Sequence, residues 1–383
     1  MLRFLTAGES HGPGLVTIIE GLPAGLDIRA DGIASELGRR RLGFGRGRRM
    51  QIEQDELEIL AGVRHARTLG SPLAVLIRNT EWSRWSVEMS PEPGEPKRVM
   101  ATPRPGHADL PGMLKYDTHD ARDILERASA RETAARTVAG YAASQLLRQV
   151  EVSILSHVVA IGPVAVPAGT TPGPGDLSAI DDSPVRVFAR EAEEAMIEAI
   201  EQAKANRDTL GGVVEVLVFG APPGLGSHVH WDRRLDAQLA AALMSVQGIK
   251  AVEMGDGLAS ALRPGSEAHD EIGYTEGGFV RSSDRAGGLE GGISTGQTLR
   301  MRAAMKPIST LMRPLRSVDV ATKEPADAFR ERSDVCAVPA AGVVAEQMVA
   351  YVLARELLRK FGGDTVGDLV AAVEAYRTRV AAF

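Results

Sequence analysis

Leu15-Val-Thr-Ile-Ile-Glu-Gly-Leu-Pro-Ala-Gly-Leu26 is the stretch that decides the fold, because its pattern recurs near the middle of the chain. It starts with β-branched residues typical of a strand and then turns at a glycine. The second copy, Val213-Val-Glu-Val-Leu-Val-Phe-Gly-Ala-Pro-Pro-Gly-Leu225, has the same strand and Gly-x-Pro-x-Gly-Leu turn. In both copies a helix is expected next, near Asp31 and near Asp232. Two copies predict an internal duplication, although Gly/Pro turn chemistry could produce the match by chance.

The rest of the chain mixes strand and helix patterns without a regular alternation. Further strands are expected at Leu73–Arg78 and Val152–Ile161. The expected helices are Ala130–Gln149, Glu191–Ala205, Asp232–Val246 and Ala341–Phe361, the last lying between Pro339 and Gly362. The segments interpreted as loops are Ser90–Pro105, Pro167–Pro184 and Gly287–Gly296. This mixture favours an α+β fold, with a single domain over residues 1–383 and pseudo-repeats at about 1–165 and 185–363, joined by the Pro/Gly-rich connection.

Composition narrows the class of protein. The 383 residues are 44% hydrophobic, which is enough for a sizeable core, and no apolar run is long enough to span a membrane. The start of the chain lacks the apolar stretch of a signal peptide, and the lone cysteine, Cys336, suits a reducing compartment, so a cytoplasmic location is expected. The net charge of −6 argues against a nucleic-acid binder, and we assign no metal ligands.

Two histidines lie in glycine-flanked loops, within Gly8-Glu-Ser-His-Gly12 and Arg104-Pro-Gly-His-Ala-Asp109. Glycines let the backbone approach a ligand closely, and histidine titrates near neutral pH. His11 and His107 are therefore candidates for general acid catalysis, with Asp109 placed to orient the second ring. The alternative for each is a hydrogen-bonded histidine in an ordinary turn.

The run Arg127-Ala-Ser-Ala-Arg-Glu-Thr133 predicts a helix start and an anion site together. Ser129 and Glu132 have the S-x-x-E spacing of a capping box, so a helix is expected from Ala130. Small residues then recur on one face, which favours close helix packing: Ala134, Ala135, Val138, Ala139, Ala142, Ala143 and Leu146. A helix N-terminus flanked by two arginines suits a phosphate, and an ordinary capped helix is the alternative.

Later motifs add candidates for anion binding. The Gly-rich run Gly291-Gly-Ile-Ser-Thr-Gly296 is followed by Lys306-Pro-Ile-Ser-Thr310, which combines hydroxyls with a lysine. Arg332-Ser-Asp-Val-Cys336 could clamp an anion, with Asp334 available for proton transfer, although a surface salt bridge is the alternative. The basic stretch Arg39–Arg49 has no obvious acidic neighbours in sequence, so we predict a mobile lid that closes over an anionic ligand, with a solvated loop as the alternative.

In this order the motifs resemble those of the chorismate synthase family, from about Met1 to the helix ending near Gly363. The resemblance implies a single-domain α+β fold with an internal repeat, in which helices are sandwiched between antiparallel β-sheets. It implies a homotetramer that converts 5-enolpyruvylshikimate 3-phosphate into chorismate by 1,4-trans elimination of phosphate, the last common step of the shikimate pathway to aromatic amino acids. It also implies reduced FMN as the cofactor, with NADPH or an external flavin reductase as the source of electrons.

The resemblance implies roles for individual residues as well. His11 is similar to the acid that assists the leaving phosphate, and His107 to the residue that protonates reduced flavin. Ser10, Ser129 and Asp334 resemble a relay near flavin N5. The positions that resemble flavin-binding ones are Arg127, Ala128, Ser129, Gln247, Gly248, Gly291, Lys306, Pro307, Ile308, Ser309, Thr310 and Arg332.

Arginines account for the remaining positions implied by the resemblance. Arg40 and Arg46 resemble NADP-binding positions, and Arg48 and Arg131 resemble substrate-binding ones. Ala128 departs from the pattern, since many relatives have Ser there. The backbone at Ala128 still supplies a donor, so only a side-chain hydrogen bond is put in doubt.

Two other functions compete with this interpretation. One is a flavin reductase that uses NADPH and carries out no elimination. Release of inorganic phosphate without net flavin oxidation would exclude this reductase and favour the chorismate synthase function. A non-enzymatic, anion- or nucleotide-binding regulatory protein would keep its ligand after loss of both histidines and would show no turnover.

Overall fold

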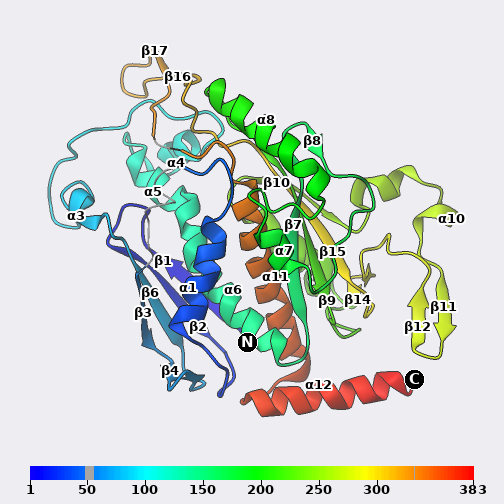
Figure 1. Cartoon of the computed structure of the whole chain (residues 1–383). Coiled ribbons are helices and arrows are strands. Elements are labelled where there is room, and N and C mark those ends of the chain that lie inside the picture. The colour runs from blue at the N-terminus through cyan, green and yellow to red at the C-terminus, as the bar shows by residue number, and fades with distance from the viewer. Residues whose placement is uncertain (48–55, 332) are drawn as a thin grey trace.

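The computed structural model describes residues 1–47, 56–331 and 333–383 and shows two antiparallel β-sheets with helices between them (Figure 1). The first sheet has the order β1-β2-β6-β3, made of β1 Arg3–Ala7, β2 Gly14–Glu20, β6 Leu73–Arg78 and β3 Glu56–Ala61. The second has the order β10-β15-β9-β7-β8, made of β10 Ile249–Met254, β15 Leu299–Met305, β9 Gly212–Phe219, β7 Ser153–Ile161 and β8 Val164–Ala165. The α+β class with sandwiched helices is confirmed.

Four helices fill the layer between the sheets: α1 Ala30–Arg41, α6 Thr133–Arg148, α9 Leu235–Met244 and α11 Val338–Phe361. α6 packs on β2, α11 packs on β7 and β9, and the two helices pack against each other. The small-residue face predicted for α6 is buried throughout. At Gly140 the approach is so close that a Cβ would lie 2.2 Å from Cβ of Gln347 on α11. The small residues of α6 therefore allow the two sheet layers to meet through this helix pair.

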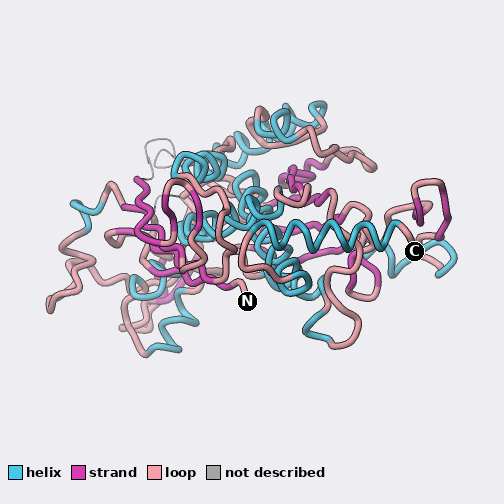
Figure 2. The backbone as a smooth tube through the Cα atoms, turned by 90° about the horizontal axis from the view of Figure 1, so that it is seen from below, coloured by secondary structure: helices cyan, strands magenta, loops and turns pink. Residues whose placement is uncertain are grey.

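The remaining elements lie outside the central layers. They are β4 Val63–Arg64, β5 Arg67–Thr68, α3 Trp82–Trp85, α4 Asp109–Tyr116, α5 Arg122–Ala128, α7 Leu177–Asp181, α8 Glu193–Ala205, α10 Gly265–Ala268, β11 Ile272–Thr275, β12 Gly278–Arg281, β13 Leu289–Glu290, β14 Ile293–Ser294, β16 Arg316–Val318, β17 Pro325–Asp327 and α12 Val366–Ala381. α12 runs across one end of the molecule to the C-terminus (Figure 2). Beyond it, the ring centroid of Phe383 lies 6.2 Å from the ring centroid of Phe279 in the β11–β12 hairpin. Among the described residues, no helix has the length and apolar character needed to cross a bilayer.

Most predicted elements are present with shifted ends. The four predicted strands are β2, β6, β7 and β9, and the predicted helices are α1, α6, α8, α9 and α11. Three of the helices begin late because a 3₁₀ turn precedes each of them: Ala130–Glu132, Arg190–Ala192 and Trp231–Arg233. α11 begins earlier than predicted, at Val338, since proline is compatible with a first helical turn. Two predicted loops also contain regular structure, namely α7 within Pro167–Pro184 and β13–β14 within Gly287–Gly296.

The two Gly-x-Pro-x-Gly-Leu turns have the same geometry. Gly21 and Gly220 have φ of 92° and 75°, and a Cβ at either would collide with the main chain just before the neighbouring strand, β1 or β7. One hydroxyl closes each turn. Thr68 Oγ1 accepts from the backbone N–H at the end of the first turn (2.9 Å) and donates to a proline carbonyl (2.6 Å), and Ser294 Oγ makes the same two bonds in the second turn (2.8 and 2.7 Å). These matching contacts support the internal duplication.

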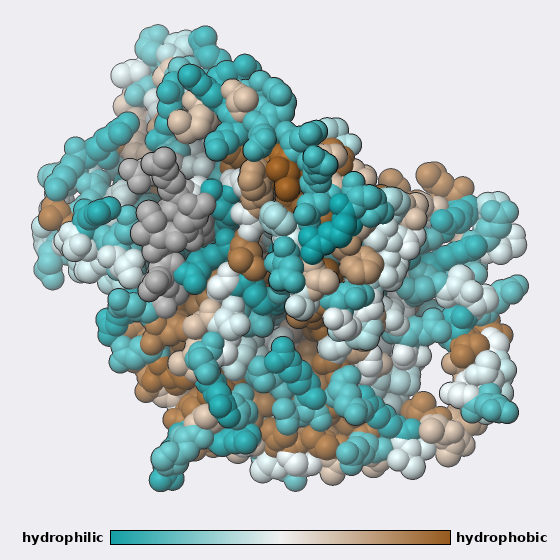
Figure 3. Space-filling view, viewed as in Figure 1, coloured by the Kyte–Doolittle hydropathy of each residue, from teal (hydrophilic) through white to brown (hydrophobic). Residues whose placement is uncertain are grey.

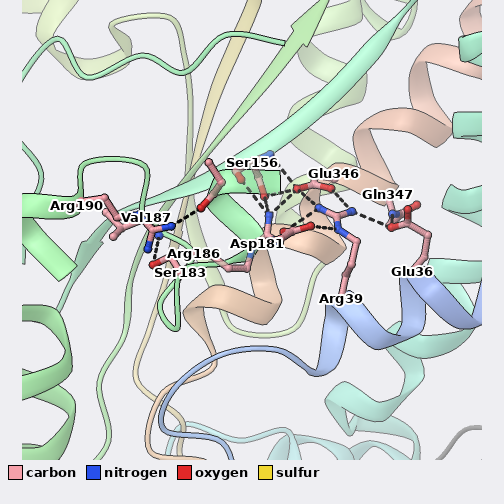
Figure 4. A network of polar contacts seen from close by, with 11 residues as sticks. Glu36, Arg39, Ser156, Asp181, Ser183, Arg186, Val187, Arg190, Glu346 and Gln347 are labelled. Atoms are coloured by element: carbon pink, nitrogen blue, oxygen red, sulfur yellow. Dashed lines mark hydrogen bonds and ion pairs between the residues drawn. The ribbon is translucent and has the colours of Figure 1, made fainter. Parts of the chain in front are cut away.

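A buried ion network joins the two halves (Figure 4). Glu346 on α11 accepts from Arg39 of α1 (2.8 Å), from Arg186 (2.9 Å) and from the hydroxyl of Ser156 on β7 (2.7 Å). Asp181 of α7 accepts from Arg39 (2.6 Å) and also pairs with Arg186, which is fully buried. Burial would lower the pKa of Arg39, but Glu346 raises it, so the guanidinium stays charged. The network thereby ties α1 and the connection Pro167–Pro184 to α11.

Candidate active site

The loops before α6 and α11 meet at one end of the sandwich, and most of the predicted site residues lie there. The end of α1 joins the two helix starts. Arg40 donates to Thr133 Oγ1 (2.8 Å) and to the carbonyl of Ala130 (3.2 Å), while Gly43 lies against Pro339 at the start of α11. Because helix N-termini carry partial positive charge and unsatisfied N–H groups, this end of the molecule is suited to an anion.

His11 is held by a carboxylate that the sequence analysis did not single out. Its Nδ1 lies 2.9 Å from Oε1 of Glu126, and its backbone N–H donates to Oε2 (2.8 Å). The imidazole stacks on Trp85 with ring centroids 3.9 Å apart. Burial would raise the pKa of Glu126, but hydrogen bonds and charge from His11 and the charge of Arg122 lower it, so the carboxylate is ionised. His11 is therefore a fixed ring and not a loosely held turn residue.

His107 has the aspartate partner predicted for it. Nδ1 lies 2.5 Å from Oδ1 of Asp109, which is fully buried. Arg104 donates to Asp109 through Nε (2.8 Å) and through its own backbone N–H (3.0 Å), and its Nη1 donates to Thr310 Oγ1 (2.8 Å). Burial would raise the pKa of Asp109, but hydrogen bonds from His107 and Arg104 lower it to about 2.

Ser129 caps a helical turn, although the predicted capping box is wrong. Its side chain accepts from the backbone N–H of Arg131 (3.3 Å) and donates to Ser10 Oγ (3.2 Å). Glu132 does not reach back to Ser129. Instead it accepts from Thr6 Oγ1 (2.8 Å), because the first turn is 3₁₀ and turns the carboxylate toward β1. The serine pair predicted for a relay is therefore formed, with Ser10 next to His11 in the chain.

Glu132 joins two of the predicted flavin-binding residues. It accepts from Gln247 Nε2 (3.0 Å) and lies 3.9 Å from Nη2 of Arg127, which also donates to the carbonyls of Thr6 and Gly8. Burial would raise the pKa of Glu132, but the charge of Arg136 and several hydrogen bonds lower it. A groove of about 620 Å³ begins at Arg127 and Glu132 and runs between β1 and α9, with α11 side chains also lining it.

The loop Lys306–Thr310 lies against the His107 loop. Lys306 Nζ donates to the carbonyl of Gly106, and Thr310 is the residue that Arg104 contacts. Thr209 also holds this loop, because its hydroxyl donates to the carbonyl of Ile308 (2.7 Å). Burial and the nearby charge of Lys250 lower the pKa of Lys306. The predicted run Lys306, Pro307, Ile308, Ser309 and Thr310 therefore borders the histidine site as one segment, with Gly248 bonded to its first residue.

Two arginines of the predicted lid, Arg39 and Arg46, pair with carboxylates, although no acidic neighbour was obvious in the sequence. Arg46 Nη1 lies 2.9 Å from Asp334 Oδ2, and the backbone N–H of Gly47 donates to Asp334 Oδ1 (2.7 Å). Arg39 belongs to the ion network of Glu346, described above. Glu346 lies 307 positions and Asp181 142 positions from Arg39, and Asp334 lies 287 positions from Gly47, so sequence neighbourhood does not show these contacts. Glu36, which also pairs with Arg39, is only three positions away and was overlooked. Arg48, like the predicted flavin-binding residue Arg332, lies outside the described residues.

Among the described residues, Gly291 lies at the opposite end of α9 from the predicted flavin-binding residues Gln247 and Gly248. It forms the turn between β13 and β14, and the next residue, Gly292, packs against Arg234 just before α9. Gln247 and Gly248 follow the other end of α9. Ten helical residues span about 15 Å, so the length of α9 separates the Gly291 turn from Gln247 and Gly248. Ala128 ends α5 beside Ser129, and Arg131 is buried in the turn before α6.

Several residues of the site were missed by sequence reasoning. Glu126 holds His11, and Arg104 holds Asp109, the partner of His107. Glu132 contacts the predicted flavin-binding residues Gln247 and Arg127. Thr6 contacts Glu132, and Trp85 stacks on His11. Glu126 directly precedes Arg127, and Arg104 opens the His107 motif, so both were adjacent to residues already chosen. Trp85 and Thr6 carry no sequence signal, because only the fold brings them to the site.

The fold and these side chains define an α+β enzyme that acts on a small-molecule substrate. The family model for chorismate synthase matches residues 2–358. Chorismate synthase of Acidothermus cellulolyticus is 58% identical, covering 98% of each chain, and that of Mycobacterium avium is 57% identical, covering 100% of this chain and 97% of the relative. A crystal structure of a chorismate synthase matches with a TM-score of 0.81 and 41% identity, covering 100% of this chain and 99% of the other. This chain belongs to the chorismate synthase family, whose members are lyases.

Proposed function

We propose that this chain catalyses 1,4-trans elimination of phosphate from 5-enolpyruvylshikimate 3-phosphate to give chorismate, with reduced FMN bound in the same site. Family membership supports the reaction. The observation that carries the proposal is the pair of histidines, His11 and His107, each bound to a buried carboxylate at the end of the sandwich where two helices begin. A substrate with a phosphate and two carboxylates also accounts for the arginines around this end.

His11 acts as the acid that gives a proton to the leaving phosphate. General acid catalysis of this kind contributes about 10²- to 10⁴-fold to a rate, provided that the donor is within hydrogen-bond reach. Glu126 and Trp85 hold the His11 ring in one orientation. His107 donates a proton on the flavin side, with Asp109 fixing its ring. Arg131 binds the substrate anion at the helix N-terminus, and Arg48, outside the described residues, completes this set.

The described residues fit FMN. Gln247 Oε1 is buried and has no hydrogen-bond partner among the described residues, so an N–H or O–H donor of the flavin would satisfy it. Arg127 and Lys306 supply positive charge suited to the FMN phosphate and its carbonyls. Gln247, Gly248 and the segment 306–310 would hold the group. When bound, reduced FMN would lend an electron that helps phosphate to leave and would recover it as the unactivated C–H bond breaks, so that no net oxidation occurs.

The proposed relay needs Asp334 to change partners. Ser129 already donates to Ser10, which places two hydroxyls in series beside His11. Asp334 instead pairs with Arg46 and the backbone of Gly47. Asp334 accepts a proton once Arg46 moves to a bound anion, such as the phosphate of NADPH. Arg40 is the second NADP-binding position of the proposal, and whether NADPH or an external flavin reductase supplies the electrons is decided by assay.

The proposed homotetramer has an exposed apolar surface available to it. Leu5 and Ile18 are 73% and 43% exposed and lie directly opposite each other on β1 and β2, and Leu60 on β3 is 52% exposed. Hydrophobic side chains also gather low on the left of the face shown in Figure 3, over the first sheet. Exposed apolar sheet faces of this kind are typical of protein–protein contacts.

An anaerobic assay tests the proposal. The protein is mixed with chemically reduced FMN and the phosphorylated ester, and chorismate absorbance and inorganic phosphate are followed together. We expect one phosphate per chorismate and no turnover with oxidised FMN. Equal turnover with oxidised FMN contradicts the mechanism, NADPH oxidation without phosphate release indicates a flavin reductase, and ligand binding without any turnover indicates a regulatory protein.

A further inference from the structure

We propose that Glu126 is a positioning residue for His11, which fixes the ring so that Nε2, and not Nδ1, delivers the proton to the leaving group. This inference rests on the proposed function of His11 as the acid. Glu126 is 3% exposed and lies on α5, so the fold and not the loop determines where its carboxylate points. The sequence motifs gave it no role.

The carboxylate holds the ring and the main chain of the loop together. Its two oxygens lie 2.9 and 3.1 Å from Nδ1 of His11, and one of them accepts the backbone N–H of the same residue (2.8 Å). The carbonyl of Glu126 also accepts the backbone N–H of Ser10 (2.9 Å). With Nδ1 facing an ionised carboxylate, that nitrogen carries a proton, so the second transferable proton of the imidazolium lies on Nε2.

Trp85 and Arg122 complete the surroundings of the His11–Glu126 pair. Trp85 offers its indole face at 3.9 Å, and an aromatic face attracts a cation. Arg122, also on α5, donates to Glu126 Oε1 (2.8 Å) and lies over the same indole at 5.1 Å. The charge of Arg122 is in turn balanced by Glu88, at 3.7 Å, and Glu331, at 3.6 Å. Arg122 therefore shares its charge among three carboxylates, and Glu126 is the one that holds His11.

Substitution of Glu126→Gln tests the inference, because glutamine keeps the size of the side chain and removes its charge. We expect kcat to fall about 10- to 100-fold. The alkaline limb of the kcat–pH profile should move to lower pH, which a purely structural contact would not cause. Glu58→Gln is the matched control, since Glu58 also pairs with an arginine, Arg78, at an exposed place on the first sheet, and it should leave the profile unchanged. In a His11→Ala background, Glu126→Gln should cause no further loss.

A second measurement needs neither turnover nor a Glu126 variant that folds. In proton NMR of the substrate-free protein, a low-field Nδ1–H signal should be present and should be lost in His11→Ala. Absence of this signal from the parent protein overturns the inference, as does an unchanged kcat and pH profile in folded Glu126→Gln. If the parent makes no chorismate, the proposed function fails, while the NMR result still decides whether Glu126 holds the ring.

Discussion

The two halves of the molecule share one skeleton and differ in their loops. The first half contains β1, β2, α1, β3, β6 and α6, and the second contains β7, β9, α9, β10, β15 and α11, with each set in the same order along the chain and in equivalent places in its sheet. The β1–β2 connection is the short loop with His11. The equivalent β7–β9 connection contains α7 and α8 instead. The comparison indicates that strands and turns set the framework, while loops of unequal length set the chemistry.

The loops that build the site occupy equivalent places as well. The chain after β6 carries His107 and Ser129 and leads into α6, and the chain after β15 carries Lys306 and Asp334 and leads into α11. The predicted repeat boundaries, about 1–165 and 185–363, stay a proposal. Matching the strands one to one assigns β7 to the second repeat, which would move the first boundary to the end of α6.

The largest expected effect is a loss of catalytic rate when either loop histidine is removed, and it tests whether these loops supply the chemistry and the strands and helices supply the stability. His11→Ala and His107→Ala should each lower kcat by about 10²- to 10⁴-fold. Each should lower the melting temperature only modestly, because the loss of one buried hydrogen bond costs about 1–3 kcal/mol. His228→Ala is the control, since this histidine is exposed and far from both motifs in sequence. A large drop in melting temperature with little loss of rate would make either histidine a structural residue.

The buried junction of the halves should show the next largest effect. Glu346→Ala leaves Arg39 and Arg186 without their shared carboxylate, which should lower the free energy of unfolding by about 3–5 kcal/mol. Glu20→Ala removes an exposed carboxylate paired with Arg3 and should cost less than about 1 kcal/mol. Urea unfolding of both variants measures the difference. If the two variants lose the same unfolding free energy, the junction of the halves does not depend on the buried ion pairs of Glu346.

Acid should weaken the His107 loop through Asp109. Because the pKa of Asp109 falls from 3.8 to about 2 on folding, its stabilisation is fully present above pH 3.8 and is lost as the pH falls through about 2. This contribution is up to about 2 kcal/mol. Asp109→Asn should therefore flatten the fall of unfolding free energy between pH 5 and 2. Asp117→Asn, at an exposed position, is the control, and a fall as steep in Asp109→Asn as in the parent would contradict the assignment.

The smallest effect should be the same in both halves. Thr68→Val and Ser294→Ala each remove the hydroxyl that closes a Gly-x-Pro-x-Gly-Leu turn and leave a buried N–H unpaired, so each should cost about 1–2 kcal/mol in unfolding free energy. Thr171→Val, at an exposed position, should cost nothing measurable. If only one of the two variants loses unfolding free energy, the two turns are not equivalent.

The sequence by itself determined the framework and the choice of site loops. Glycines at Gly21 and Gly220 and the β-branched strands before them specify the paired turns, because local backbone geometry follows from local residues. The small residues of α6 likewise predict a close contact with another helix, and Gly140 makes this contact with Gln347 of α11. The motifs around His11, His107 and Lys306 were found as short runs for the same reason.

Only the tertiary structure decided the partners. Glu126 comes to His11 from 115 positions away, Asp334 to Gly47 from 287, and Glu346 to Arg39 from 307. No local pattern encodes such contacts, since they depend on how α5 and α11 pack against the sheets. The capping box failed in the same way, because Glu132 gains more partners across β1 and Gln247 than Ser129 would offer it. Burial at the junction of the two halves, and not spacing along the chain, decides which charges meet.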